Sequence, residues 1–315
     1  MDIKYSDINS IVNKKEYYEN LKKQCLLLKD KQLKIGQEII EKVYPFIRQY
    51  KLEIQGEENI PNDSNVLFLV NHSNSHDIFT AYEMLSLLER KGSVMVATDC
   101  LSPITNEIFN ISNATLLDRR IKEERQKSVL IMSKKMLEGR DGVIFGEGTW
   151  NLHPVLPMHN IRQGASTISA ITQVPIIPTI FEYVEEDGFI RSEGELYQKC
   201  LISFGKPVMI NYNEDLIKQT NLIRTEMIRM RKQIWDDCRI IRKEIKDIDP
   251  LMYLNHTYIK KFKAFGFTYN SQKEQEFLLF LENETKENEY TLDRAGNFKP
   301  GITEKNCELV KKLRK

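Results

Sequence analysis

The chain has 315 residues, of which 41% are hydrophobic, and its 46 lysines and arginines nearly balance 45 aspartates and glutamates. This length and hydrophobic content suffice for one large domain or two smaller ones with a proper core. The balance of charge excludes the chain-wide positive field that favours nucleic-acid binding, so we expect no nucleic-acid partner.

Five cysteines, at positions 25, 100, 200, 238 and 307, are widely spaced and form no CxxC or Cys/His cluster. This pattern favours reduced thiols in a cytoplasmic protein over disulfides or a zinc site. The first residues, MDIKYSDINS, lack a basic start followed by an apolar core, so no secretory signal is expected. No stretch approaches the roughly 18 apolar residues that a transmembrane helix needs, so we expect any membrane association to be peripheral.

Along the chain, residues 10–50 are rich in Lys, Glu, Gln, Leu and Ile and predict one or two charged amphipathic helices. Beyond about residue 60, short β-branched runs alternate with helical patterns. This alternation predicts an α/β fold with a mixed, largely parallel sheet flanked by helices. The predicted strands are 66–70, 93–98, 142–145, 174–181 and 201–210, and the predicted helices between them are 78–90, 121–138 and 161–171.

The chain after residue 213 is helical and charged in pattern. In 222–246, apolar residues recur every three or four positions among eight basic and four acidic residues. Two interpretations remain open: a helix packed on the core with a solvated outer face, or a helix that lies on a membrane surface. We therefore divide the chain into a helical amino-terminal segment (1–59), an α/β core (60–213) and a helical carboxyl-terminal extension (214–315).

The stretch NHSNSHD, residues 71–77, directly follows the apolar run VLFLV. Ligands of open α/β sheets bind at the carboxyl ends of strands. If 72–76 form a turn and Asp77 opens the next helix as its N-cap or first-turn acid, its carboxylate reaches one nitrogen of His72. A histidine oriented in this way accepts a proton from a hydroxyl near neutral pH. The spacing is equally compatible with a capping aspartate beside a loop histidine.

Three further segments point to the same crevice. FGEGTW (145–150) places Glu147 between two glycines, which lets backbone amides approach a ligand and aims Glu147 and the Thr149 hydroxyl at it. LLDRR (116–120) supplies arginines, whose fork suits a phosphate. VPIIP (174–178) supplies a rigid strand entry that constrains the wall of a groove.

These four segments, in this order, resemble the motifs of the glycerolipid acyltransferase family, which includes glycerol-3-phosphate and lysophosphatidic acid acyltransferases. The likeness covers residues 66 to about 210. Members move a fatty acyl group from a thioester to a hydroxyl of a glycerol-based lipid. The resemblance implies that His72 is the base and Asp77 its orienting partner. It implies substrate contacts for Arg119, Glu147, Gly148 and Thr149.

The resemblance further implies direct attack of the hydroxyl on the thioester, without a covalent intermediate, a cofactor or a metal. The donor would be acyl-CoA or an acyl carrier protein thioester. The acceptor would be a lysophospholipid, most like 1-acylglycerol-3-phosphate. The enzyme would be cytoplasmic and peripherally associated with a membrane, with 10–50 and 222–246 as the candidate docking segments.

Two departures from the family pattern concern the acceptor. The EGT segment continues with Trp150 and Asn151 where the family has an arginine and a serine, and Asn113 stands where glycine is common. Arg120 or Arg162 are candidates to replace the missing cation. Trp150 would suit contact with a sugar or an acyl chain, although it is equally compatible with core packing.

These departures leave alternatives open. The acceptor would then be a non-phosphate hydroxyl of a glycan or glycolipid, or the chain would be a catalytically inactive lipid-binding module. A metal site at His72, His76 and Asp77 is not expected, because no third ligand motif such as HExxH is present.

Overall fold

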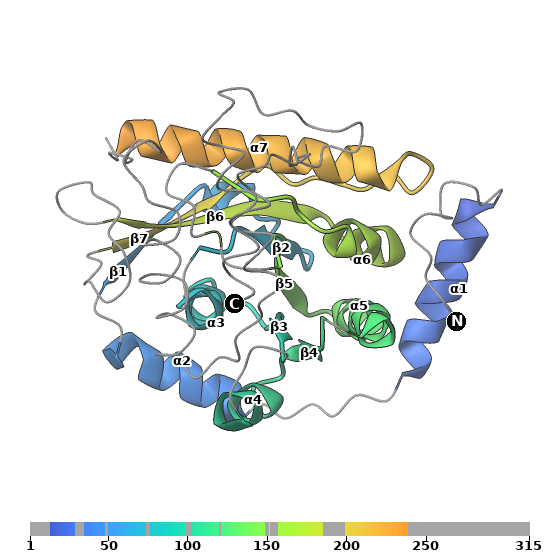
Figure 1. Ribbon diagram of the computed structural model, residues 1–315, viewed down its shortest axis with the longest axis horizontal. Helices are drawn as coiled ribbons and strands as arrows, with labels where there is room; N and C mark the ends of the chain where they lie inside the picture. Colours follow the sequence, from blue (N-terminus) through green and yellow to red (C-terminus); the bar gives the residue numbers. More distant parts are fainter. Residues whose placement is uncertain are drawn as a thin grey trace, which may run out of the picture.

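The computed structural model describes residues 13–28, 35–47, 50–73, 76–98, 103–119, 121–148, 151, 157–184 and 199–238. These residues form a seven-stranded sheet with helices on both of its faces (Figure 1). The helices are α1 (Lys14–Leu27), α2 (Ile35–Ile47), α3 (Asp77–Leu87), α4 (Pro103–Asn110), α5 (Lys122–Leu137), α6 (Gly164–Thr172), α7 (Leu216–Asp237) and the short 3-10 helix η2 (Glu57–Asn59). The strands are β1 (Lys51–Gln55), β2 (Leu67–Val70), β3 (Gly92–Ala97), β4 (Thr115–Leu117), β5 (Asp141–Phe145), β6 (Ile176–Val184) and β7 (Lys199–Phe204).

The strand order is β1-β7-β6-β2-β5-β3-β4. All neighbouring strands run parallel except β6 and β7, which are antiparallel. The predicted α/β fold with a mixed, largely parallel sheet is therefore confirmed. Strand β2 lies at the centre of the sheet between β5 and β6, so the carboxyl end of β2 opens beside the end of β5.

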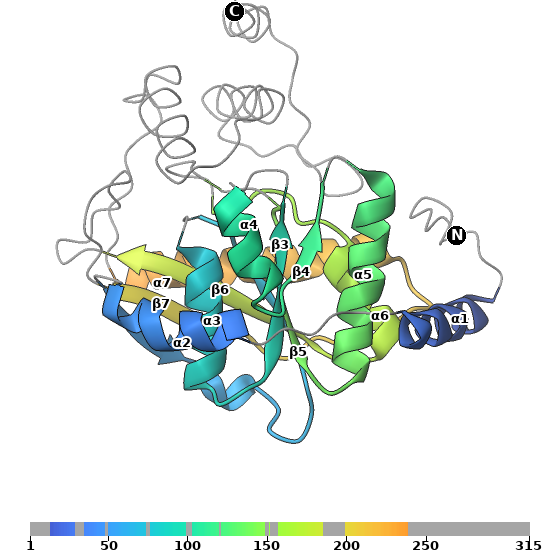
Figure 2. The same cartoon turned by 90° about the horizontal axis from the view of Figure 1, so that it is seen from below.

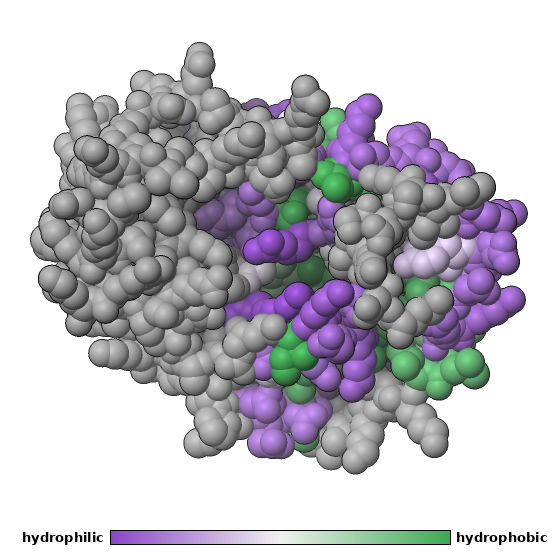
Figure 3. Space-filling view, turned by 45° about the vertical axis from the view of Figure 1, so that its right-hand side comes forward, coloured by the Kyte–Doolittle hydropathy of each residue, from purple (hydrophilic) through white to green (hydrophobic). Residues whose placement is uncertain are grey.

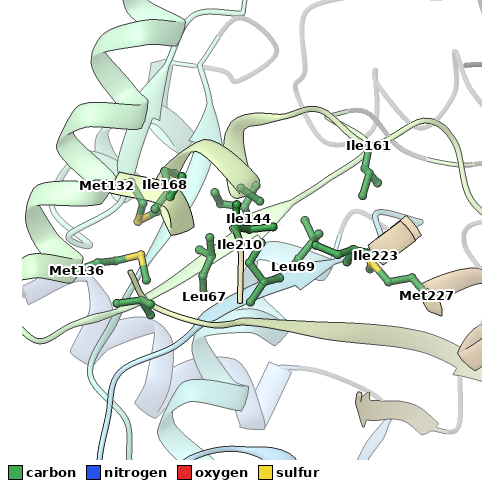
Figure 4. Packing of buried hydrophobic residues seen from close by; sticks show 14 of the residues in the cluster. Leu67, Leu69, Met132, Met136, Ile144, Ile161, Ile168, Ile210, Ile223 and Met227 are labelled. Carbon is green, nitrogen blue, oxygen red and sulfur yellow. The ribbon is translucent and has the colours of Figure 1, made fainter. Parts of the chain in front are cut away.

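Alternate residues of β2 point to opposite faces of the sheet. Leu67 and Leu69 belong to a core with α1, α5, α6 and α7, whereas Phe68 and Val70 belong to a core with α2, α3 and α4. Figure 4 shows the two leucines among side chains of α5, α6 and α7. Burial of both faces explains why the run VLFLV is continuously apolar rather than alternating.

Several observed elements differ from those predicted. The strand predicted at 201–210 ends at Phe204, and Val208 forms only an isolated bridge to Ile176. Strand β1, strand β4 and helix α4 were not predicted. Strand β1 pairs in parallel with β7 and lies within 1–59, the segment predicted to be helical.

The position of helix α7 decides between the two interpretations of its apolar stripe. Ile223, Met227, Met230 and Ile234 are buried in the core that covers β6. Figure 2 shows α7 running behind the sheet, on the side opposite α2, α3 and α4. The proposal that this stripe docks on a membrane is therefore corrected, because burial against the sheet removes it from the surface. Residues 239–246 of the predicted helix lie outside the described residues.

Candidate active site

The chain leaves β2 through Asn71, whose side chain is fully buried. Its amide nitrogen donates to the carbonyl of Phe181 at 3.0 Å, and its side-chain oxygen accepts from the Phe181 amide at 2.7 Å. These bonds satisfy the backbone of β6 after β2 has ended, so the main chain can diverge from the sheet at His72. Sequence reasoning missed this role, although a polar residue directly after a buried strand was a usable signal.

His72 and Asp77 are in contact. The Nδ1 atom of His72 lies 2.8 Å from Oδ2 of Asp77, which also accepts a hydrogen bond from the Ser73 amide at 2.8 Å. Asp77 is fully buried in the first turn of α3, where the amino-terminal end of the helix dipole stabilises a carboxylate. The predicted contact is confirmed, with Asp77 as the first-turn acid and His76 at the N-cap.

The His72 ring is held on one face as well. It stacks on Phe145 of β5, with ring centroids 4.5 Å apart and planes inclined by 25°. Its side chain is 14% exposed. Because Nδ1 faces Asp77, Nε2 is the ring nitrogen that we assign to proton exchange with a substrate. The carboxylate and the stacked ring together fix the orientation of the imidazole before any ligand binds.

Glu147 has a different environment from the one expected. It is buried, and its Oε1 accepts from the His72 amide at 2.8 Å while its Oε2 accepts from the His159 amide at 2.7 Å. Burial raises the pKa of Glu147 to about 7, against the lowering effects of the two amides and of Arg231 and Arg224. Both carboxylate oxygens thus join two loops, and a contact of Glu147 with substrate stays a prediction.

Both peptide groups that flank His72 are therefore anchored to the β5 side of the site. The His72 amide donates to Glu147, and the His72 carbonyl accepts from the Asn151 amide at 2.5 Å. Asn151 is one of the departures from the family pattern, and this contact uses its main chain. The catalytic loop is consequently held by main-chain bonds that a different side chain at 151 would preserve.

Side chains of two arginines lie beside Gly148. Its φ of +65° lies in the left-handed region that glycine adopts readily. Arg119 donates from Nη1 to the Gly148 carbonyl, and a side-chain carbon of exposed Arg162 lies 3.9 Å from where a Cβ at Gly148 would stand. The predicted residues Thr149 and Trp150, and the compensating candidate Arg120, lie outside the described residues.

Asn113 stands where the resembled family commonly has glycine, and its backbone conformation is one that glycine also adopts. Its φ is +58°, in the left-handed region, where asparagine is the best tolerated residue after glycine together with aspartate. Its carbonyl accepts from Ser93 at 2.8 Å and from Lys135 at 3.0 Å. Asn113 therefore adopts a backbone conformation that glycine also adopts readily.

His76 belongs to a buried network of hydroxyl groups. Its Nδ1 lies 2.9 Å from the Tyr44 hydroxyl, which lies 2.7 Å from that of Tyr50. Tyr50 continues to Thr80 at 2.7 Å, and Thr80 to Tyr183 at 3.0 Å. Within the described part of the chain, no group of three or more His, Cys, Asp or Glu side chains could hold a metal ion.

Two arginines of α7 reach the loop that follows β5. Arg224 donates to the carbonyls of Met158 and His159, both at 2.8 Å, and Arg231 donates to the Pro157 carbonyl at 2.6 Å. Arg231 also pairs with Glu182 of β6 at 2.5 Å. Sequence reasoning missed both arginines. Their seven-residue spacing on the apolar face of the helix was the available signal.

An open α/β sheet that presents a carboxylate-oriented histidine at the end of a central strand has the geometry that general-base catalysis requires. Residues 51–182 match the family model described as Acyltransferase.

Among solved structures, the chain is similar to the crystal structure of the 1-acyl-sn-glycerophosphate (LPA) acyltransferase PlsC from Thermotoga maritima. The TM-score is 0.48 and the sequence identity is 18%. The match covers 73% of this chain and 93% of the other. No curated protein sequence matches the chain significantly.

Proposed function

We propose that the chain transfers a fatty acyl group from an acyl thioester to the hydroxyl of a lysophospholipid, most like a 1-acylglycerol-3-phosphate O-acyltransferase. The single observation that carries this proposal is the 2.8 Å contact between Nδ1 of His72 and Oδ2 of Asp77 at the end of β2. The match of residues 51–182 to the Acyltransferase family model supports the reaction class. The contact supports His72 as the base that this reaction needs, because a neutral hydroxyl attacks a thioester slowly unless its proton is removed.

In the proposed reaction, Nε2 of His72 takes the acceptor's hydroxyl proton while the hydroxyl oxygen attacks the thioester carbonyl carbon. Asp77 stabilises the imidazolium that forms, as in other carboxylate-oriented histidines. The tetrahedral intermediate then collapses, the carbon–sulfur bond breaks, and the imidazolium returns its proton to the leaving thiolate. The products are the acylated lipid and a free thiol, on coenzyme A or on an acyl carrier protein.

A phosphate on the acceptor is supported by the two arginines beside Gly148. Arg119 and Arg162 approach this glycine from different segments, and Arg162 is exposed. Guanidinium groups bind phosphate through charge-assisted hydrogen bonds. Arg162→Gln should therefore raise KM roughly tenfold for lysophosphatidic acid, the loss of a bond worth about 1.5 kcal/mol, and leave KM for monoacylglycerol unchanged. Equal KM values for wild type and variant would favour a non-phosphate acceptor.

The direct experiment is a thiol-release assay with acyl-CoA and acyl carrier protein thioesters against a panel of acceptors. The panel comprises lysophosphatidic acid, other lysophospholipids, glycerol 3-phosphate, monoacylglycerol and a glycolipid. His72→Gln should lower kcat by roughly 10²- to 10⁴-fold, the contribution of a positioned base. His76→Gln, in the same loop, is the matched control and should stay within a few-fold of wild type. A His72 variant that keeps most of its rate would refute the proposed mechanism. Lysolipid binding without turnover would favour the inactive lipid-binding module.

We propose that the enzyme collects its acceptor at a membrane surface through α2. Among the helices that the structure describes, none is long and apolar enough to cross a membrane. The described surface seen in Figure 3 carries its hydrophobic residues in small groups among hydrophilic ones. Helix α2, however, exposes Ile39, Val43 and Phe46 at helical spacing, and Phe46 is 90% exposed. Its inner face is fixed beside the site through the bond from Tyr44 to His76.

Loss of the apolar stripe tests this membrane contact. Phe46→Glu combined with Val43→Glu should weaken co-sedimentation with anionic vesicles, because both side chains would otherwise bury apolar area in the interface. The matched control is Leu222→Glu on α7, an exposed leucine on a helix whose apolar face is buried. Equal sedimentation of both variants with wild type would remove α2 as the docking element.

A further inference from the structure

Helix α7 lies outside the matched family segment, and yet it contacts the active-site loops through two buried cations. Arg224 and Arg231 are only 3% and 4% exposed. Their guanidinium groups donate to the three consecutive carbonyls of Pro157, Met158 and His159. Apolar residues of the same helix already cover the sheet, so packing alone does not require two buried charges there.

The three carbonyls belong to the loop that holds Glu147. The peptide group of His159 offers its carbonyl to Arg224 and its amide to Oε2 of Glu147, at 2.8 Å and 2.7 Å. The other carboxylate oxygen of Glu147 accepts from the His72 amide. An unbroken series of hydrogen bonds therefore joins the guanidinium of α7 to the main chain of the base.

We propose that α7 positions the catalytic base, with Arg224 as the principal positioning residue: it fixes the loop 157–159, the loop fixes Glu147, and Glu147 fixes the main chain of His72. This inference rests on the proposed role of His72 as base. Arg231 supports the same loop from Pro157 and is itself held by Glu182 of β6. Both arginines bond to main-chain carbonyls of this loop, so we expect their effect to be on the placement of the imidazole.

Electrostatics reinforce the geometry. The groups that face Glu147 are the His72 and His159 amides and the guanidinium groups of Arg224 and Arg231. Burial raises the pKa of Glu147 to about 7, and the two arginines act in the opposite direction. The His159 ring adds no positive charge, because burial and the same arginines lower its pKa to about 3. Ionised Glu147 accepts both amide bonds well, so the arginines favour the state in which both loops are joined.

A direct test uses the fact that both amides bonded to Glu147 belong to histidines. The chain has five histidines, so selective labelling with nitrogen-15 histidine gives few backbone amide signals, and single His→Gln variants assign them. As Glu147 titrates, the His72 and His159 amide shifts should move together with one midpoint near the pKa of about 7. Glu147→Gln should abolish this shared transition.

Arg224→Gln should raise the shared midpoint, because an opposite charge that favours the ionised carboxylate is lost. The matched control is Arg229→Gln, which removes an exposed arginine of the same helix and should leave the midpoint unchanged. Movement of His159 alone, or equal midpoints in Arg224→Gln and Arg229→Gln, would overturn the proposal.

Arg224→Lys separates the effect of the positive charge from that of the two hydrogen bonds that the planar guanidinium donates to the carbonyls of Met158 and His159. It should keep the midpoint near that of wild type, and it should speed hydrogen exchange at the His72 and His159 amides, because a single ammonium does not reproduce the planar fork. If Arg224→Gln fails to fold, this exchange comparison decides, and wild-type exchange at both amides would overturn the proposal.

Kinetics complete the test. The acidic limb of kcat/KM for acyl transfer should shift to higher pH in Arg224→Gln by the same amount as the amide midpoint, and it should not shift in Arg229→Gln. An unmoved limb with a moved amide midpoint would show that the link does not reach catalysis, which overturns the proposal. Absence of any acyl transfer in wild type would instead refute the proposed function, while the amide titrations would still decide whether α7 controls the His72 main chain.

Discussion

Burial of Glu147 should make the stability of this protein depend on pH in a defined window. The pKa of Glu147 is about 7 in the folded protein against an ordinary value of 4.5. The folded state therefore binds more protons than the unfolded state between about pH 4.5 and about pH 7, and the free energy of unfolding falls as pH rises through this window. The difference of about 2.5 pKa units corresponds to roughly 3 kcal/mol that the ionised form costs above pH 7.

Glu147→Gln should remove this dependence. The amide adds a constant penalty, because its NH₂ group faces one of the two backbone donors, but it has no charge to bury. In denaturant unfolding from about pH 5 to about pH 8, the variant should gain roughly 3 kcal/mol relative to wild type as pH rises. Glu58→Gln, at an exposed position of η2, is the control and should give a flat difference. A flat difference for Glu147→Gln as well would refute the reasoning.

Three further predictions concern the contacts around the base. Asp77→Asn should lower kcat roughly 10²-fold or more in the thiol-release assay while leaving the fold intact, because the imidazole loses its stabilising charge. Gly146→Ala should lower the free energy of unfolding by about 1 to 3 kcal/mol in denaturant titrations, since its Cβ would stand 2.7 Å from Cδ1 of Leu69. Asn71→Ala should cost about 2 kcal/mol or more in the same titrations, because both backbone groups of Phe181 would lose their partner.

The parts of the fold that could be predicted from sequence are those with strong local patterns. The run VLFLV became β2 because both of its faces are buried, and the periodic stripe after residue 213 became α7. Strand β1 was not predicted because it lies at the edge of the sheet, where exposed polar residues alternate with partly buried ones. Strand β4 was not predicted because three residues are too few to show a strand pattern. Pairing partners far along the chain, not local preference, stabilise both strands.

The site, like the fold, has contacts that local sequence predicts and contacts that depend on remote partners. The contact between His72 and Asp77 spans five residues, so a turn and a helix start sufficed to predict it. The partners of Glu147 are main-chain amides on either side of it in sequence, one of them 75 residues away. A backbone donor leaves no trace in residue identity, so the sequence could not predict that Glu147 joins two loops. Arg224 is a further 65 residues beyond the carbonyl that it holds.

Loss of the α7 contacts should therefore leave the local contact between His72 and Asp77 in place. The pair of His72 and Asp77 is contained within one loop and the first turn of α3, so it can persist when α7 is perturbed. The position of that loop relative to Gly148, where we expect the acceptor to bind, depends on Glu147 and hence on the arginines of α7. A base that is correctly oriented but displaced from its acceptor loses rate steeply, because catalysis by proximity depends on sub-ångström alignment. We therefore expect the residues that position the base to extend beyond residue 182, where the family match ends, to at least Arg231.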